Sequence, residues 1–328
     1  MHTGEQPRVA AAGPAIDVLV TGAGGFVGRV LVRRLLAEGV CGRPVGRLVV
    51  VDLSMQGLPD DARLQRIEGS LADTGLLARA LAVPVQVVFH LASVPGGAAE
   101  QDPDLGRRVN LDATLQLLGH LRAQGGAPVF VFASTVAVYG DPLPAVVDED
   151  TPALPAMSYG AHKLAAEVLI ADAARRGDVR ACSLRLPGVV ARPGDGAGLV
   201  SAFMSQLFWR LRAGDPIVLP VSAEGTAWWI SVSACVDNLL HAAQLDTARL
   251  GPRRVVQMPA LHLSMAEVVE ALVRAHGDDR RSLVSHALQA RVQRLFASYP
   301  PLHTPRALAL GFVHDGSADG LVRRATEA

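Results

Sequence analysis

Short apolar runs alternate with longer amphipathic segments over the first two thirds of the chain. Continuous apolar runs are typical of parallel strands that helices cover on both faces. They predict strands at Asp17–Thr21, Leu48–Asp52, Val85–Leu91, Val129–Ser134 and Ala181–Leu186. Apolar residues at helical spacing predict the intervening helices Gly28–Ala37, Leu105–Ala123 and Ser158–Arg175. This alternation predicts an α/β fold built on a doubly wound parallel sheet.

The pattern changes after about Pro187, where loops rich in Gly and Pro separate the helical segments. The loops are Arg192–Gly198, Ala213–Pro216 and Val221–Thr226, and the helices are Leu199–Leu211, Val232–Leu245 and Ser264–His276. We therefore expect residues 16–187 to form the main domain and residues 188–328 a smaller lobe. The boundary is soft, because such lobes often return a strand to the main sheet. Residues 1–15, rich in Gly, Pro and polar residues, predict a loose N-terminal tail.

Composition narrows the possible partners. Acidic and basic residues balance at 31 each, so no overall field attracts nucleic acid or an anionic membrane. No apolar run is long enough to cross a bilayer, and the N-terminus lacks the apolar core of a secretory signal. The scattered Cys41, Cys182 and Cys235 indicate reduced thiols rather than disulfides, and the histidines show no metal-ligand spacing. We expect a cytoplasmic protein without metal, nucleic acid or membrane partners.

The first predicted strand runs into a glycine-rich turn and then a helix. Gly22, Gly25 and Gly28 form G-x-x-G-x-x-G, with Phe26 and Val27 at the start of the helix. The first glycine permits the tight turn, the second lets a pyrophosphate approach the backbone, and the third lets helix and strand pack closely. The helix N-terminus presents free N–H groups to the phosphates. The motif predicts a dinucleotide site, although a glycine-rich loop without ligand is the alternative.

Asp52 ends the second predicted strand. A carboxylate there can accept hydrogen bonds from the adenosine ribose diol and would repel a 2′-phosphate, which favours NAD over NADP. The alternative is a solvated aspartate that only terminates the strand.

Tyr159 and Lys163 stand four residues apart on a predicted helix that Ser158 can cap, so both face the same side. An ammonium beside a phenol stabilises the phenolate and lowers the pKa of the tyrosine. Such a tyrosine can remove a hydroxyl proton while a C–H hydride leaves for a nicotinamide. The alternative is an ordinary exposed helix pair.

Ser134 and Thr135 end the fourth predicted strand, at the carboxyl edge where open α/β sheets bind ligands. The Thr135 hydroxyl can hydrogen-bond the reacting oxygen and orient it. The alternative is that both hydroxyls only terminate the strand through local backbone bonds.

These motifs, with His90-Leu91-Ala92-Ser93 and Arg108–Thr114 between them, resemble the extended short-chain dehydrogenase/reductases, a family that includes sugar-nucleotide epimerases and dehydratases. The resemblance covers nearly the whole chain and implies a Rossmann fold with NAD as cofactor. It implies Tyr159 as the base, Lys163 as the group that lowers its pKa and holds the nicotinamide ribose, and Thr135 as the hydroxyl partner. The motifs and the resemblance together place cofactor contacts at Gly22, Gly25, Phe26, Val27, Gly28, Asp52, Leu71, Leu91, Ala92, Ser93, Asn110, Ser134, Tyr159, Lys163 and Pro187.

Within that family the chain resembles D-erythronate dehydrogenase-type enzymes, which oxidise the C2 hydroxyl of a four-carbon sugar acid with NAD. The segments that carry this likeness include Gly22–Leu36, His90–Thr114, Tyr139–Pro144, Leu184–Pro187, Ala191–Gly194 and Val218–Val221. The resemblance implies an NAD-dependent dehydrogenase that oxidises a secondary hydroxyl of a small hydroxy acid or sugar acid.

Two positions depart from the family pattern. Ser70 precedes Leu71 where the family usually has Asp-Leu, and Gly225–Trp229 lacks the basic residues that such relatives carry beside the tryptophan.

Substrate contacts are expected at Thr135, Tyr159, Arg192 and Trp228. Arg192 can clamp a carboxylate through two parallel hydrogen bonds. The alternatives are a surface turn for Arg192, which precedes Pro-Gly, and core packing for Trp228.

Two other functions are considered. The first is a sugar-nucleotide epimerase or dehydratase that retains NAD, for which Arg210, Arg212, Arg253 and Arg254 offer basic residues for a nucleotide diphosphate. The second is a non-enzymatic NAD-binding regulator, which the presence of Tyr159 and Lys163 disfavours.

Apolar residues beyond one face of the helices Leu105–Ala123 and Ser158–Arg175 indicate assembly. They include Leu117, Leu118, Leu164, Val168 and Leu169. In extended family members the corresponding helices pair across a two-fold axis, so the resemblance implies a homodimer. The alternative is that both stripes are buried inside the monomer.

Overall fold

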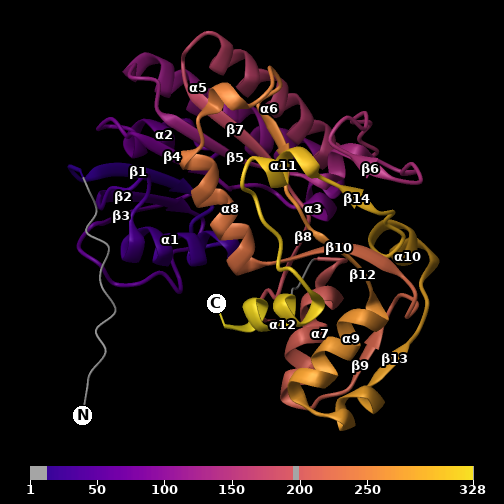
Figure 1. The fold of residues 1–328 in the computed structure, drawn as a ribbon. Helices are drawn as coiled ribbons and strands as arrows, with labels where there is room; N and C mark the ends of the chain where they lie inside the picture. Colours follow the sequence, from indigo (N-terminus) through magenta and orange to yellow (C-terminus); the bar gives the residue numbers. More distant parts are fainter. Residues whose placement is uncertain (1–12, 195–198, 328) are drawn as a thin grey trace, which may run out of the picture.

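The main body of the computed structural model is one seven-stranded sheet with helices on both sides (Figure 1). The model describes residues 13–194 and 199–327. All neighbouring strands of this sheet run parallel, in the order β11-β7-β5-β4-β1-β2-β3. The predicted doubly wound α/β fold is therefore confirmed. Most of the predicted N-terminal tail, residues 1–12, and the end of the loop predicted at Arg192–Gly198 lie outside the described residues.

The first part of the chain supplies most of the main sheet. Its elements are β1 (Ile16–Thr21), α1 (Phe26–Glu38), β2 (Val45–Asp52), β3 (Leu64–Glu68), α2 (Thr74–Ala80), β4 (Val87–His90), α3 (Gly96–Gln101), α4 (Pro103–Arg107), the π-helix η1 (Arg108–Asp112), α5 (Ala113–Gln124), β5 (Val129–Thr135), the 3₁₀ helix η2 (Val136–Tyr139), β6 (Val147–Asp148), α6 (Ser158–Arg175) and β7 (Arg180–Leu186).

The later part of the chain contributes elements both to the main sheet and to a second, smaller core. Its elements are β8 (Gly188–Val190), α7 (Ala202–Ala213), β9 (Ile217–Leu219), β10 (Thr226–Ser231), α8 (Val232–Gln244), η3 (Thr247–Arg249), β11 (Val255–Gln257), β12 (Leu261–Ser264), α9 (Met265–His276), η4 (Asp278–Leu283), β13 (Val284–His286), α10 (Ala290–Phe296), β14 (Leu302–His303), α11 (Pro305–Ala309) and α12 (Ala318–Thr326).

Each face of the main sheet has its own apolar core. On one face, α2, α5 and α6 bury side chains such as Leu117 and Ile170 against Phe130. On the other face, α1 and α8 bury side chains such as Leu31 and Leu239. Every residue of β5 is buried, because helices cover it on both sides. This burial explains why the central strands are continuous apolar runs in the sequence.

The chain after Pro187 contributes both to the main sheet and to a second core. The β12-β10-β8 sheet, the β13-β9 pair and the helices α7, α9 and α12 form a second core, which contains Phe208 and Trp229 (lower part of Figure 1). In contrast, α8 returns to cover the main sheet, and β11 adds its outermost strand beside β7. Residues on both sides of the expected boundary at residue 187 therefore belong to the main sheet, in line with a soft boundary.

The structure interrupts the helix predicted at Leu105–Ala123. The π-helical stretch Arg108–Asp112 separates α4 from α5, and a π turn widens a helix by one residue and re-aims its side chains. Asn110 lies in this π-helical stretch, and its side chain is buried.

Further differences concern short or polar elements, among them β3, α2 and the cap of α6. β3 and α2 were not predicted. β3 is an edge strand whose exposed positions carry polar residues, so it does not form an apolar run in the sequence. Ser158 does not cap α6: Met157 is the N-cap residue, and the Ser158 N–H donates instead to Glu100 Oε2 at 2.9 Å.

No helix within residues 13–194 and 199–327 is long and apolar enough to span a membrane.

Candidate active site

The glycine turn between β1 and α1 is shaped by close backbone contacts. Gly22 has φ +73°, and a Cβ there would lie 2.6 Å from the Ala92 nitrogen. A Cβ on Gly28 would lie 2.0 Å from the Gly22 oxygen, so α1 can approach β1 only without a side chain. A Cβ on Gly25 would meet only the Gly22 oxygen, at 3.2 Å, which leaves its outer side open for a ligand to approach. The turn therefore fits a dinucleotide pyrophosphate at the N-terminus of α1.

Asp52 lies beside this turn at the carboxyl end of β2. Its Oδ2 accepts a hydrogen bond from the Gly24 N–H at 2.9 Å, and its Oδ1 accepts one from the Leu53 N–H at 2.7 Å. A carboxylate in this place can also accept bonds from a ribose diol, so the glycine turn and β2 together fit the adenosine half of NAD. Leu71, which follows β3, is buried.

The segment after β4 is fixed by Asn110. The Asn110 Oδ1 accepts from the Val94 N–H at 2.7 Å, and its Nδ2 donates to the Val94 oxygen at 3.1 Å. Asn110 thus holds the end of the segment Leu91–Ser93, which faces the glycine turn through the contact of Gly22 with Ala92. In the structure, Asn110 acts on this segment through the backbone of Val94.

A chain of buried hydrogen bonds supports the same segment from beneath. Thr114 Oγ1 donates to the Asn110 oxygen at 3.1 Å, so His90 Nε2 must donate its hydrogen to Thr114 Oγ1, 2.9 Å away. His90 Nδ1 then accepts from Thr21 Oγ1 at 2.6 Å. The geometry thus fixes one neutral tautomer, and burial lowers the pKa of His90 to about 3.

Lys163 is buried between α6 and β5. It is 1% exposed, and its Nζ donates to the Ala133 oxygen at 2.7 Å. The Nζ lies 4.5 Å from the centre of the Phe132 ring and 6.0 Å from that of the Tyr159 ring. Burial lowers the pKa of Lys163 to about 7, and the nearby charge of Glu167 opposes this effect. Lys163 is also the only lysine in the sequence.

Tyr159 lies against the end of β5. Burial raises the pKa of its phenol, while hydrogen bonds with Thr135 and Ser93 lower it in part. The sequence predicted that Lys163 lowers this pKa. In the structure the ammonium is bonded to Ala133, and the net shift of the Tyr159 pKa is upward. The two side chains are thus close to each other, but the pKa of the Tyr159 phenol is not lowered.

The two hydroxyls at the end of β5 have different surroundings. Thr135 Oγ1 accepts from the Ala137 N–H at 3.1 Å, which caps η2, and also reaches the Tyr159 phenol. Ser134 is 2% exposed and donates to Glu167 Oε1. Its hydroxyl therefore belongs to a buried network rather than to an open surface.

That buried network is the feature that the sequence analysis missed. Glu167 binds Arg185 through both carboxylate oxygens, and Arg185 lies 5.0 Å from the centre of the Tyr139 ring. The available signal was the position of Glu167, four residues after Lys163 on the same helix. Nothing in the sequence pairs it with Arg185, because the contact joins α6 to β7.

The two proposed substrate residues lie in different surroundings. The Arg192 guanidinium lies 5.2 Å from the centre of the Phe26 ring, at the start of α1, and no described carboxylate pairs with it. Trp228 has no exposed surface; its Nε1 donates to the Pro300 oxygen, and its ring packs against Tyr139 and Tyr299. Arg192 is thus beside the glycine turn, whereas Trp228 is a core residue that meets no open site.

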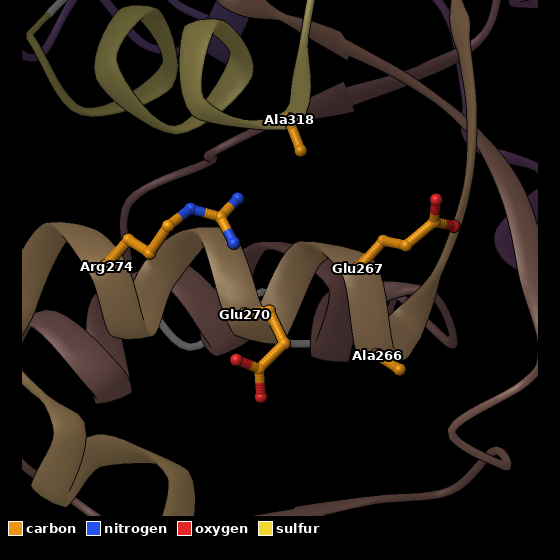
Figure 2. A pocket seen from close by; sticks show the side chains of 5 residues that line it. All are labelled: Ala266, Glu267, Glu270, Arg274 and Ala318. Carbon is orange, nitrogen blue, oxygen red and sulfur yellow. The ribbon is translucent and has the colours of Figure 1, made fainter.

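A separate hollow of about 310 Å³ lies between α9 and α12 (Figure 2). It is lined by Ala266, Glu267, Glu270, Arg274 and Ala318. Its charges already have partners in the protein: Glu267 caps α9 through Ser264, and Arg274 pairs with Asp319 at 2.7 Å. Glu270 points away from Arg274 in Figure 2 and pairs with Arg281. The hollow lies on the surface of α9 and α12, outside the second core, and contains none of the predicted site residues.

Comparisons with known proteins agree with this geometry. Residues 18–256 match the family described as NAD dependent epimerase/dehydratase. The chain is 41% identical over 315 residues to the D-erythronate dehydrogenase of Cupriavidus necator, which covers 94% of this chain and 97% of that protein. It is 30% identical to the D-erythronate dehydrogenase of Haemophilus influenzae, over 95% of this chain and 99% of that protein.

A solved structure shows the same likeness. The nucleoside-diphosphate-sugar epimerase from Agrobacterium tumefaciens superposes with a TM-score of 0.89 at 30% identity, covering 98% of this chain and 96% of that one.

The buried His90 predicts a specific pH dependence of stability. Unfolded chains take up a proton on this histidine below about pH 6.5, whereas the folded protein does not do so until about pH 3. The free energy of unfolding should therefore fall by about 1.4 kcal/mol per unit as the pH drops below about 6.5. Urea unfolding should show a loss of about 2 kcal/mol from this group by about pH 5.

The matched variant is His90→Gln, whose amide can donate and accept but cannot titrate. Its unfolding free energy should depend less steeply on pH over the same interval. Parallel curves for both proteins would show that His90 is not the source of the dependence.

Proposed function

The chain belongs to the NAD-dependent epimerase/dehydratase family, and on that premise we propose that it oxidises a secondary hydroxyl of a small hydroxy acid such as D-erythronate. The single observation that carries this choice is the 41% identity, over nearly the full length of both chains, to a protein named D-erythronate dehydrogenase. NAD is the cofactor. When bound, it supplies the acceptor for the hydride.

The proposed chemistry uses three side chains at the carboxyl edge of the sheet. Thr135 holds the substrate hydroxyl by a hydrogen bond, and Tyr159 takes the proton from that hydroxyl. The carbon–hydrogen bond breaks at the same time, its electron pair leaves with the hydride, and a carbonyl remains. The protonated Lys163 stabilises the phenolate form of Tyr159, which is the form that accepts this proton. The hydrogen bonds of Tyr159 with Thr135 and Ser93 support this arrangement.

The proposed cofactor site runs from the glycine turn to the end of β7. Gly22, Gly25 and Gly28 would admit the pyrophosphate, with the N–H groups of Phe26 and Val27 at the N-terminus of α1. Asp52 would accept bonds from the adenosine ribose. The remaining proposed contacts are Leu71, Leu91, Ala92, Ser93, Asn110, Ser134, Tyr159, Lys163 and Pro187.

The sugar-nucleotide epimerase alternative needs free cations for a diphosphate. In the structure, Arg210 pairs with Asp215 and Arg253 with Asp150. Arg212 donates to the Thr326 oxygen, and Arg254 to the Leu250 oxygen. Arg210 and Arg253 are thus paired with carboxylates, which favours the dehydrogenase, whereas Arg212 and Arg254 bind backbone oxygens and keep their charge.

Incubation with free NAD and a panel of sugar acids, hydroxy acids and UDP-sugars tests this choice. Accumulation of NADH with a four-carbon sugar acid is expected, because a dehydrogenase releases its reduced cofactor. Conversion of a UDP-sugar without net NADH would contradict the proposal, and so would binding of NAD without turnover of any compound.

We further propose a cytoplasmic homodimer that acts in carbohydrate metabolism. Leu117 and Leu118 are buried inside the monomer, but Val168 and Leu169 on α6 and Leu115 on α5 are exposed. Leu115, Leu118 and Leu169 also line a hollow of about 180 Å³ between these helices. A second copy of the chain is the proposed occupant of this surface, related by a two-fold axis.

The variant Tyr159→Phe tests the base. It keeps the ring but loses the proton acceptor, so turnover should fall by about a hundredfold or more, while NAD binding stays within about twofold. Tyr299→Phe is the matched control, since this partly buried tyrosine packs against Trp228 outside the site, and it should turn over normally. Steady-state rates and a titration of NAD binding decide the outcome. A Tyr159→Phe protein with more than a tenth of normal turnover would rule out the proposed base.

The variant Arg192→Gln tests the proposed carboxylate contact. Loss of a charge-assisted hydrogen bond should raise KM for the acid by about ten- to a hundredfold and leave the Kd for NAD unchanged. Arg210→Gln, which removes an exposed arginine of α7, should change neither value. A weaker Kd for NAD with an unchanged KM would instead assign the guanidinium to the cofactor pyrophosphate.

Light scattering at micromolar concentration tests the assembly. The native protein should have the mass of a dimer, and Leu169→Glu should have that of a monomer, because a buried unpaired charge is costly. Val218→Glu places the same charge on an exposed apolar residue of β9 and should remain dimeric. A monomeric native protein in the presence of NAD would refute the dimer.

A further inference from the structure

A buried ion pair lies behind the lysine of the site. Glu167 is 2% exposed and accepts from Arg185 Nε at 3.0 Å and from Arg185 Nη2 at 2.8 Å. The same carboxylate accepts from the Ser134 hydroxyl. Three elements of the fold, β5, α6 and β7, are thus joined through one carboxylate.

Stability alone does not account for this arrangement. A buried ion pair gains little over apolar residues of similar volume, because both charges lose their hydration. Two members of this network lie close to residues of the site: Ser134 precedes Thr135, and Glu167 is one helical turn after Lys163. The position of the pair indicates a role in the chemistry of the neighbouring side chains.

The charges around Lys163 are few. The titratable groups that act on it are His90 on β4, and Tyr159 and Glu167 on α6. Arg185 on β7 and Tyr139 on η2 lie behind Glu167 and interact with each other. His90 is neutral at physiological pH, and burial raises the pKa of both tyrosines. Glu167 is therefore the negative charge among them. It raises the pKa of Lys163 against the effect of burial.

We propose that Glu167, held by Arg185 and Ser134, is a positioning residue that keeps Lys163 charged beside Tyr159. Its role in turnover rests on the proposed function, because only a charged Lys163 stabilises the Tyr159 phenolate that accepts the proton of the substrate. Glu167 thereby sets the upper pH limit of activity: above the pKa of Lys163 the ammonium is lost, and the phenolate loses its neighbouring positive charge.

The sequence offers a direct test, because Lys163 is the only lysine. Protein labelled with ¹³C-lysine gives a single side-chain Cε signal, whose chemical shift reports the protonation of Lys163. In Glu167→Gln the midpoint of this titration should fall by one pH unit or more, and the alkaline limb of the kcat/KM profile should fall with it. At a fixed pH between the two midpoints, the ratio of charged to neutral Lys163 should change about tenfold or more.

Two further variants cover the case in which Glu167→Gln does not fold. Glu167→Asp keeps the charge on a shorter side chain, and its Lys163 midpoint should stay within a few tenths of a unit of the native one. The double variant Glu167→Gln/Arg185→Met removes both charges of the ion pair, so Arg185 is not left buried without its partner. Its midpoint should also fall, because the nearer charge is that of Glu167.

Glu270→Gln is the matched control. Glu270 forms a bidentate pair with Arg281, at 2.8 Å for both bonds, but on the exposed surface of α9. Its loss should leave the Lys163 titration unchanged.

The outcomes separate this inference from the proposed function. An unchanged Lys163 midpoint in Glu167→Gln or in the double variant overturns the inference, and so does a larger shift in Glu167→Asp than in Glu167→Gln, since that order follows side-chain length and not charge. The titration needs neither NAD nor substrate. A protein that shows the predicted shifts but oxidises no acid retains the inference and loses the proposed function.

Discussion

The site is organised around the burial of one ammonium group. Lys163 has almost no contact with solvent, and its known partners are the Ala133 oxygen, the Phe132 ring and the charge of Glu167. A charge at this depth is costly unless partners compensate it. The end of β5, the first half of α6 and the end of β7 are therefore held in fixed relation. Tyr159 and Thr135 lie on two of these segments, so their relative position follows from the same constraint.

The doubly wound fold brings these segments together. Parallel strands end at one edge of the sheet, and the order β7-β5-β4-β1-β2 sets the ends of β5, β4 and β1 next to one another. The glycine turn after β1 packs against the segment after β4, and the bonds of His90 and Asn110 fix that segment from below. The path expected for a dinucleotide, from Asp52 past the glycine turn to Tyr159, thus crosses consecutive strands of one sheet.

Much of this arrangement was predictable from the sequence, for definite reasons. Buried parallel strands have no polar face, so β1, β2, β4, β5 and β7 appear as apolar runs. The glycines are required because a side chain would collide with backbone: a Cβ on Gly28 would lie 2.0 Å from the Gly22 oxygen. β3 was not predictable in this way, because an exposed edge strand can carry Gln65 and Arg66 without cost. Sequence also could not pair Glu167 with Arg185, or show that Trp228 is enclosed by Tyr139 and Tyr299, since these contacts join distant segments.

The pKa of Tyr159 shows the limit of reasoning from spacing. Four residues on a helix correctly place Tyr159 and Lys163 on one side, but burial acts on both groups and opposes the charged form of each. The pair therefore depends on its surroundings, above all on Glu167 and on the hydroxyls of Thr135 and Ser93, for the charges that the proposed chemistry requires.

The central claim is that a hydride passes from a hydroxyl-bearing carbon of a free acid to NAD. The most direct measurement uses D-erythronate that carries deuterium on C2, the carbon whose hydroxyl we expect to be oxidised. The acid is incubated with NAD, and the cofactor is analysed by mass spectrometry and NMR. We expect one deuterium at C4 of the nicotinamide in the released reduced cofactor, with one equivalent of keto acid formed. Reduced cofactor without deuterium, or unreacted acid under conditions in which NAD is bound, would contradict the claim.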